Sequence, residues 1–204
     1  MKINKNKFIY LISPNKIDAQ FYKHLNVVLG TGKVSFFQMR FKKYSFDQKI
    51  LIGTKIRKIC KKNSVKFLVN DDPLLSKKLN ADGCHLGQKD TNIIEARRII
   101  GNKIIGITCH NSVRLAKAAI KDKASYLAFG AFFLTKTKKA KHKATTKILE
   151  KVKKLTKTPL VAIGGINSSN YKKLLLNNAN FLAISSYIWN NKKYKPLEAI
   201  KKIK

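Results

Sequence analysis

The chain has 204 residues, 44% of them hydrophobic, which fits a single domain over residues 1–204 that needs no disulfide or metal to hold its core. It carries 44 Lys and Arg residues against 10 Asp and Glu, a formal net charge of +34. No apolar run is long enough to span a bilayer or act as a signal peptide, so we expect a cytoplasmic protein with no membrane partner. The charge attracts nucleic acid and phosphorylated metabolites alike, and it does not choose between them.

Short apolar runs recur along the chain and predict eight strands. They cover residues 8–12, 34–39, 67–69, 84–86, 104–108, 126–129, 160–163 and 181–184. Helical spacing of apolar residues occurs between most of them, in residues 48–59, 93–100, 113–120, 148–155 and 171–175. Alternating strands and helices indicate parallel strands with crossover helices, and eight such strands favour a closed (β/α)8 TIM barrel. An open, doubly wound sheet is the alternative.

The few acidic residues fall at informative places. Asp71 and Asp72 directly follow the third predicted strand, and Asp90 closes the loop after the fourth. Because all strands of a parallel barrel end on one face, Asp71 and Asp90 can share one Mg²⁺, with substrate phosphates as further ligands. For Asp72 we expect a capping role, because it precedes Pro73 at the start of the next helix.

Cations gather at the same predicted face. Arg40 and Lys42 follow the second strand, while Thr135, Thr137 and Lys138 follow the sixth. The latter three lie in residues 131–143, the longest stretch without predicted structure, and long loops at this face of a barrel tend to be functional. Arg and Lys side chains here predict binding of phosphate oxygens.

Small residues follow the last two predicted strands. Gly164 and Gly165 come after the seventh, and Ser185 and Ser186 after the eighth. Barrels of this class usually bind a phosphate at these two positions. Together with the acids and cations, this predicts two anion sites, one for a monophosphate and one for a metal-bound diphosphate. A transferase acting on two phosphorylated small molecules fits that arrangement.

Six segments resemble the thiamine phosphate synthase family, in the same order and across essentially the whole chain. They are residues 38–42 (QMRFK), 70–71 (ND), 83–90 (GCHLGQKD), 106–110 (GITCH), 135–138 (TKTK) and 162–166 (AIGGI). The resemblance implies condensation of hydroxymethylpyrimidine diphosphate with a thiazole phosphate, carboxylated or not, giving thiamine phosphate and diphosphate. In that family the C–O bond ionises first, and the thiazole nitrogen then captures the pyrimidine-methyl cation without a general base.

The resemblance also implies a role for each matching residue, with Mg²⁺ as cofactor held by Asp71 and Asp90. The pyrimidine diphosphate would be bound by Gln38, Met39, Arg40, Phe41, Lys42, Asn70, Thr108 and Lys138, of which Arg40, Lys42, Thr108 and Lys138 are the catalytic candidates. The thiazole phosphate would be bound by Thr135, Lys136, Thr137, Gly165, Ser185 and Ser186. Thr108 stands where the family usually has Ser. For His85 an orienting or packing role is expected.

Two alternative functions stay open. A thiazole tautomerase is a barrel of similar sequence, but it has no use for the diphosphate and metal residues, so the synthase is favoured. A nucleic-acid-binding protein would account for the charge, yet the lysines are spread along the chain and Arg occurs at only five positions. We expect phosphorylated small molecules as partners and no specific nucleic acid, and a homo-oligomer is left open.

Overall fold

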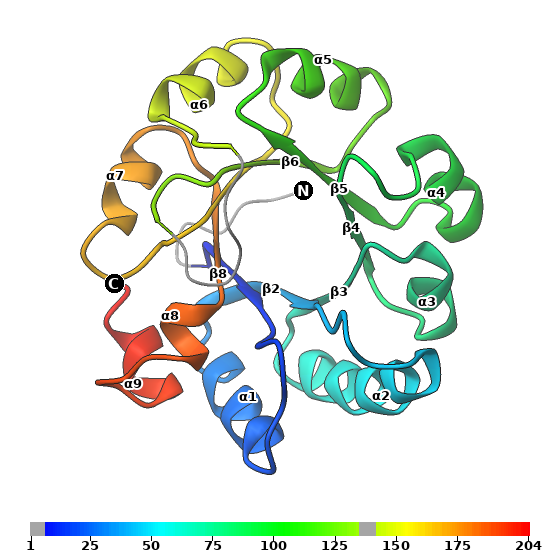
Figure 1. Cartoon of the computed structure of the whole chain (residues 1–204), viewed down its shortest axis with the longest axis vertical. Helices are drawn as coiled ribbons and strands as arrows, with labels where there is room; N and C mark the ends of the chain where they lie inside the picture. The colour runs from blue at the N-terminus through cyan, green and yellow to red at the C-terminus, as the bar shows by residue number, and fades with distance from the viewer. Residues whose placement is uncertain (1–6, 135–141) are drawn as a thin grey trace.

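The structure is a computed structural model that describes residues 7–134 and 142–204. Within these residues, eight parallel strands pair in sequence order and close into a barrel, with helices on its outside (Figure 1). The barrel closes between the first and last strands, where Leu11 is in register with Ile184. The predicted TIM barrel is therefore confirmed, and the open sheet is wrong.

The strands and helices alternate from one end of the described chain to the other. The strands are β1 (Ile9–Ile12), β2 (Val34–Met39), β3 (Lys66–Asn70), β4 (Gly83–Leu86), β5 (Ile104–His110), β6 (Tyr126–Phe129), β7 (Leu160–Ile163) and β8 (Phe181–Ile184). The helices are α1 (Phe21–Leu29), α2 (Phe46–Lys62), α3 (Pro73–Lys78), α4 (Ile93–Ile100), α5 (Val113–Lys121), α6 (Thr146–Lys153), α7 (Tyr171–Leu176), α8 (Ser186–Trp189) and α9 (Pro196–Lys201). None of the helices in the described ranges is long and apolar enough to cross a membrane.

Side-chain caps start four of these helices. Ser45 accepts a hydrogen bond from the backbone of Gln48, whose side chain accepts one from Ser45 in return. Asp72, Asn92 and Ser112 begin α3, α4 and α5, and each accepts the backbone N–H three residues further on. These residue types are the ones that cap helices well, so local sequence decides where these helices begin.

The strand side chains fall into two layers. Inside the barrel lies a small cluster that includes Tyr10, Phe36, Leu68, Tyr126 and Phe181. The alternate positions face outward into a larger apolar layer between the strands and the helices. The inward positions near the C-termini of β2 to β5 are polar, whereas those of the other strands are apolar, so the candidate site lies at the β2–β5 side of the barrel mouth.

Candidate active site

Two pairs of polar side chains from four neighbouring strands line the barrel mouth. Gln38, at the end of β2, is buried, and its Nε2 donates a hydrogen bond to Asn70 Oδ1 on β3 at 2.9 Å. His85 on β4 pairs through Nε2 with Thr108 Oγ1 on β5, also at 2.9 Å. The structure thus brings together Gln38, Asn70 and Thr108, three residues that the sequence assigns to the pyrimidine diphosphate.

Asp71 and Asp90 lie close enough together beside these side chains for each carboxyl group to shift the pKa of the other. Asp71 follows β3 with a φ of 63°, a left-handed conformation that is uncommon outside glycine, and its N–H donates to the carbonyl of His85 at 2.8 Å. Asp90 accepts the N–H of Gly87 at 2.7 Å. The backbone therefore directs both carboxyl groups to one place.

The electrostatics of this pair are those of two carboxyl groups that compete for one proton. Burial alone would raise the pKa of Asp71, but hydrogen bonds with Asp90 and Lys42 outweigh it and lower that pKa. Burial and the neighbouring Asp71 carboxyl raise the pKa of Asp90. Lys42 Nζ lies 3.0 Å from Asp71 Oδ2 and supplies one compensating charge. A cation between the two carboxylates would relieve their repulsion.

The donor set at this pair fits Mg²⁺ bound together with a phosphorylated ligand. No group of three or more metal-ligating His, Cys, Asp or Glu side chains occurs within residues 7–134 and 142–204. Mg²⁺ typically takes one or two carboxylates and leaves its other positions to water and substrate phosphates, which is what Asp71 and Asp90 can offer.

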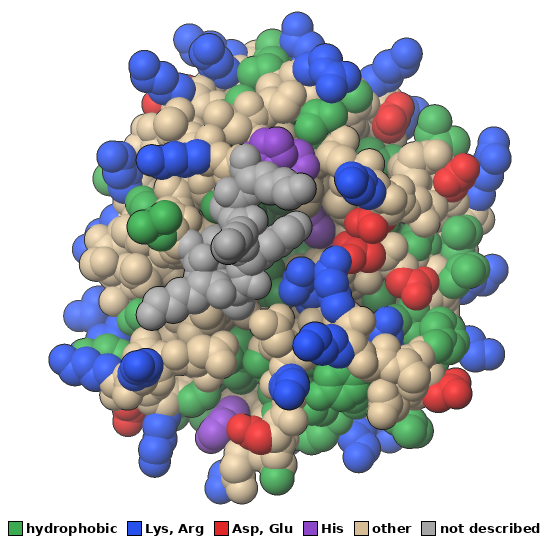
Figure 2. Space-filling view, in the orientation of Figure 1, with side chains coloured by type: hydrophobic (Ala, Val, Ile, Leu, Met, Phe, Trp, Pro, Cys, Tyr) green, Lys and Arg blue, Asp and Glu red, His purple; other side chains and the backbone are tan. Residues whose placement is uncertain are grey.

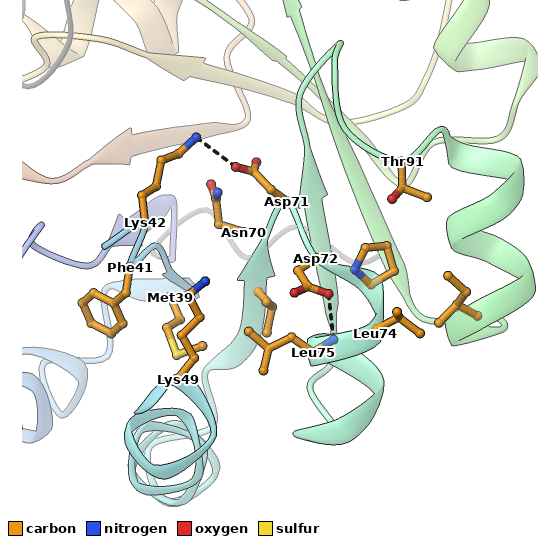
Figure 3. Close-up of a pocket in the computed structure, with 13 residues that line it drawn as sticks. Met39, Phe41, Lys42, Lys49, Asn70, Asp71, Asp72, Leu74, Leu75 and Thr91 are labelled. Carbon is orange, nitrogen blue, oxygen red and sulfur yellow. Dashed lines mark hydrogen bonds and ion pairs between the residues drawn. The ribbon is translucent and has the colours of Figure 1, made fainter. Parts of the chain in front are cut away.

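A cavity of about 450 Å³ lies beside the carboxylates, between β2, β3 and the start of α3. Figure 3 shows Lys42 and Asp71 pointing toward each other across its upper edge. Met39 and Phe41 border it, but their side chains are buried in the apolar layer outside the barrel. Met39, a predicted substrate residue, thus points to the opposite side of β2 from Gln38, and Phe41, which follows the strand, packs in the same apolar layer.

Asp72 turns away from the carboxylate pair, although it is adjacent to Asp71. Its Oδ1 accepts the N–H of Leu75 at 2.8 Å, and Pro73 occupies the first turn of α3 (Figure 3). The predicted capping role is confirmed.

Gly165 and Ser185, two of the residues predicted to bind the thiazole phosphate, follow the paired strands β7 and β8. Gly165 has a φ of 64°, and a Cβ there would lie 2.3 Å from the carbonyl oxygen of Leu134. Glycine therefore allows the chain after β6 to cross closely over this turn. Ser185 donates its hydroxyl to the carbonyl of Ser13 at 3.0 Å, and Ser186 begins α8.

Four predicted site residues fall outside the described ranges. They are Thr135, Lys136, Thr137 and Lys138. Their assignments to the thiazole phosphate and to the diphosphate stay predictions. Arg40, by contrast, is described, and its backbone N–H donates to Ser13 Oγ at 2.9 Å, which ties the end of β2 to the end of β1.

Sequence reasoning missed the polar contacts beneath the mouth. Tyr126 lies on β6, and its hydroxyl is 2.8 Å from His85 Nδ1 and 2.8 Å from the hydroxyl of Tyr10. Both tyrosines belong to apolar strands and to none of the motifs found in the sequence. The one sequence feature that could have identified them is a hydroxyl group at a strand position that points into the barrel. Burial lowers the pKa of His85 to about 4, so the ring is neutral at pH 7.

The cysteines contribute no nucleophile to the site. Cys60, Cys84 and Cys109 are all free and buried. Burial raises the pKa of Cys109 to about 12, although it is next to His110 in sequence. A thiol with that pKa carries almost no thiolate at neutral pH.

Sequence comparisons relate this chain to thiamine phosphate synthases. A family model described as thiamine monophosphate synthase matches residues 9–188. The chain is 68% identical over 204 residues to the thiamine-phosphate synthase of Pelagibacter ubique, covering 100% of this chain and 98% of that protein. It is 40% identical over 186 residues to the thiamine-phosphate synthase of Rhodospirillum centenum, covering 90% and 89% of the two chains.

A solved structure agrees with the sequence comparisons. The thiamine phosphate pyrophosphorylase from Pyrococcus furiosus superposes with a TM-score of 0.86 at 28% identity, covering 98% of this chain and 94% of that one. The family match spans all eight strands and both described halves of the candidate site. The chain therefore belongs to the thiamine monophosphate synthase family.

Proposed function

We propose that this protein is a thiamine-phosphate synthase, which joins hydroxymethylpyrimidine diphosphate to a thiazole phosphate and releases diphosphate. The observation that carries the proposal is the pair of neighbouring carboxyl groups of Asp71 and Asp90, with Lys42 paired to Asp71 and the Gln38–Asn70 pair beside them. This arrangement suits a diphosphate with its metal ion. The relatives' shared name supports the same reaction.

Asp71 and Asp90 would hold Mg²⁺. When bound, the ion would neutralise negative charge that accumulates on the departing diphosphate. Lys42 lies beside the pair and is exposed on its other side, so its ammonium group can move from Asp71 to a phosphate oxygen. Arg40, from the same loop, adds a planar donor for phosphate.

The chain's remaining residues would hold the two rings rather than transfer protons. The C–O bond of the pyrimidine diphosphate breaks with its electron pair leaving on diphosphate, and the thiazole nitrogen lone pair forms the new C–N bond. No proton moves in either step, so no base is needed, which agrees with a neutral His85 and a protonated Cys109. Catalysis then rests on orienting the rings at close distance and stabilising the leaving group.

The thiazole phosphate would lie across the ends of β7 and β8. Gly165 presents backbone there without a side chain, and Ser185 and Ser186 follow on the neighbouring strand. This places the two substrates on opposite sides of one barrel mouth, with their reacting ends toward its centre.

The test of the proposal uses purified protein with both substrates and Mg²⁺, and it measures diphosphate release together with thiamine phosphate. Formation of both in equal amounts is expected. The competing function is isomerisation of the thiazole, since a tautomerase has no use for the carboxylate pair or Lys42. Conversion of the thiazole alone, without diphosphate release, would overturn the proposal.

The metal assignment has its own test in two substitutions. We expect Asp71→Ala and Asp90→Ala each to lower kcat by about 100-fold or more, because a site that stabilises leaving-group charge contributes at least that much. Asp122→Ala is the matched control, since Asp122 follows α5 at the other end of the barrel. Thermal unfolding of all three variants shows whether the fold is kept. Wild-type turnover in both Asp71→Ala and Asp90→Ala would exclude the assigned metal site.

A further inference from the structure

A chain of hydrogen bonds runs through the barrel interior and ends at the candidate site. Tyr10 and Tyr126 join their hydroxyl groups at 2.8 Å, Tyr126 reaches His85 Nδ1 at 2.8 Å, and His85 Nε2 reaches Thr108 Oγ1 at 2.9 Å. Tyr10 and Tyr126 are fully buried, whereas Thr108 is partly exposed at the mouth. His85 is also partly exposed, but both of its ring nitrogens are already paired, so Thr108 is the group with hydrogen-bonding capacity left for a ligand.

The interior is built around this chain of contacts. His85, Gly106 and Tyr126 are neighbours in register on β4, β5 and β6. A Cβ on Gly106 would lie 1.8 Å from the Tyr126 ring, so glycine is what lets that ring lie across β5. The Tyr126 and His85 rings then stack, with centroids 5.7 Å apart and planes 12° from parallel. The ring positions are thus fixed by packing, not only by the hydrogen bonds.

The hydrogen atoms of this chain can be arranged in one direction without leaving a buried donor unpaired. Tyr10 donates to Tyr126, Tyr126 donates to His85 Nδ1, and His85 donates from Nε2 to Thr108 Oγ1. Each buried hydrogen then has an acceptor. This direction requires the neutral His85 tautomer that carries its hydrogen on Nε2.

The opposite direction leaves one buried donor unpaired. If His85 carried its hydrogen on Nδ1, it would donate to Tyr126, and Tyr126 would donate to Tyr10. The Tyr10 hydroxyl hydrogen would then point among apolar side chains, since its one polar partner in the described chain is Tyr126. A buried hydroxyl without a partner is costly, so the first direction is favoured. A doubly protonated ring would leave the same hydrogen unpaired.

From this asymmetry we infer that Tyr126 is a positioning residue, which fixes the His85 tautomer and thereby presets Thr108 as a hydrogen-bond donor to the substrate. Thr108 Oγ1 accepts from His85, so its own hydrogen is left for the ligand. A pyrimidine ring nitrogen has an in-plane lone pair to receive it, whereas the lone pair of an amino group on such a ring is delocalised into the ring and accepts poorly. The inference rests on the proposed function, in which the pyrimidine occupies the mouth beside Thr108.

The first test reads the tautomer without substrate and so is independent of any reaction. Two-bond proton–nitrogen NMR of histidine-labelled protein distinguishes a hydrogen on Nε2 from one on Nδ1. His85 is assigned by comparison with His85→Gln. We expect the hydrogen on Nε2 in the wild type and a loss of that single state in Tyr126→Phe. A hydrogen on Nδ1 in the wild type would overturn the inference.

The second test compares two substitutions that each delete one buried phenol hydroxyl. Tyr126→Phe keeps the ring but no longer donates to His85, and we expect kcat/KM for the pyrimidine diphosphate to fall roughly tenfold or more, about the effect of one hydrogen bond. KM for the thiazole phosphate should not change. Tyr10→Phe is the matched control: Tyr126 still donates to His85 there, so kcat/KM should stay near the wild-type value.

A second pair of variants, at Thr108, keeps the inference testable if Tyr126→Phe fails to fold. Thr108→Ser retains the hydroxyl and should keep most of kcat/KM for the pyrimidine diphosphate, whereas Thr108→Val should lose about as much as Tyr126→Phe. Equal kinetics of Tyr126→Phe and Tyr10→Phe, or of Thr108→Val and Thr108→Ser, would contradict the inference. If the protein catalyses no synthase reaction but His85 still carries its hydrogen on Nε2, the proposed function fails and the hydrogen-bond direction stands.

Discussion

Gln38 and Met39 are neighbours in β2, yet they meet different surroundings, because successive side chains of a strand point to opposite sides. Gln38 enters the barrel and donates to Asn70, while Met39 packs in the apolar layer under the helices. The motif over residues 38–42 assigns both residues to one ligand without this distinction. A sequence motif therefore does not show which of its residues point into the site. The direction of each side chain along the strand decides that.

His85 makes the stability of the protein depend on pH. Burial lowers the pKa of His85 to about 4, whereas histidine in an unfolded chain titrates near 6.5. Between these pH values the unfolded chain binds one proton more than the folded chain, so the free energy of unfolding decreases as the pH falls from 7 toward 4. We expect His85→Gln to show a smaller decrease in Tm between pH 7 and pH 5 than the wild type. Equal decreases would contradict the buried, neutral state of His85.

The contacts between distant residues could not be predicted from the sequence. Tyr10 and Tyr126 are 116 positions apart, and their hydroxyl groups meet only because β1 and β6 face each other across the closed barrel. The acidic site residues, in contrast, could be predicted from the sequence because the chain contains so few Asp and Glu residues. Asp71 directly follows a predicted strand, Asp90 closes the loop after the next one, and parallel strands end on the same face of the barrel.

Among the secondary-structure elements, the turn before α3 gives two adjacent aspartates different roles. Asp71 takes a left-handed φ of 63° and points its carboxyl group to Asp90 and Lys42. Asp72 takes an extended conformation and caps the helix. The turn between β3 and α3 thus supplies one residue for the site and one for the helix that follows.

Removing the cap should weaken the fold without removing the metal site. We expect Asp72→Ala to lower the free energy of unfolding by about 1 kcal/mol, a usual effect of losing a helix cap, and to leave the Mg²⁺ dependence of turnover unchanged. Asp72→Asn is the control, because its side-chain oxygen can still accept the N–H of Leu75. Denaturant unfolding measures the first effect and a Mg²⁺ titration of activity the second. A loss of turnover comparable to that of Asp71→Ala would place Asp72 in the site instead.

Strand boundaries were more predictable than helix boundaries. The predicted bounds of β2, β6, β7 and β8 are those of the structure, because each is a short run of apolar or aromatic residues with a clear stop. The predicted pattern over residues 148–155 runs past the end of α6 at Lys153. Helix α1 was not predicted, although Phe21, Leu25, Val28 and Leu29 have helical spacing and are buried.

For the whole molecule, the distribution of charge matters more than its amount. Figure 2 shows Lys and Arg side chains around the entire visible face, with few acidic side chains among them. They do not form the single stripe that follows a nucleic-acid backbone. The Lys and Arg side chains are thus spread over this face of the molecule, while the charges assigned to catalysis lie at strand ends.

A salt titration against duplex DNA tests this description of the surface. Binding through dispersed lysines should be detectable in dilute salt and should weaken by about 1,000-fold or more between 50 and 200 mM salt, since it depends on released counterions. Two duplexes of unrelated sequence should give the same curves. Tight binding of one of them that persists at 200 mM salt would show a specific nucleic-acid partner.

The closure of the barrel has a consequence for how the protein is made. Ile9 of β1 pairs with Leu182 of β8. One edge of β1, the first strand to be synthesised, therefore stays unpaired until β8, the last strand, has been made. At common rates of synthesis that wait is roughly 10 to 30 s, during which unpaired strand edges can join with those of other chains. Because Lys and Arg residues occur along the whole sequence, the growing chain is positively charged throughout that interval and repels its copies. The excess of lysine can thereby protect the unfinished barrel from aggregation, a task unrelated to the substrates that the finished barrel binds.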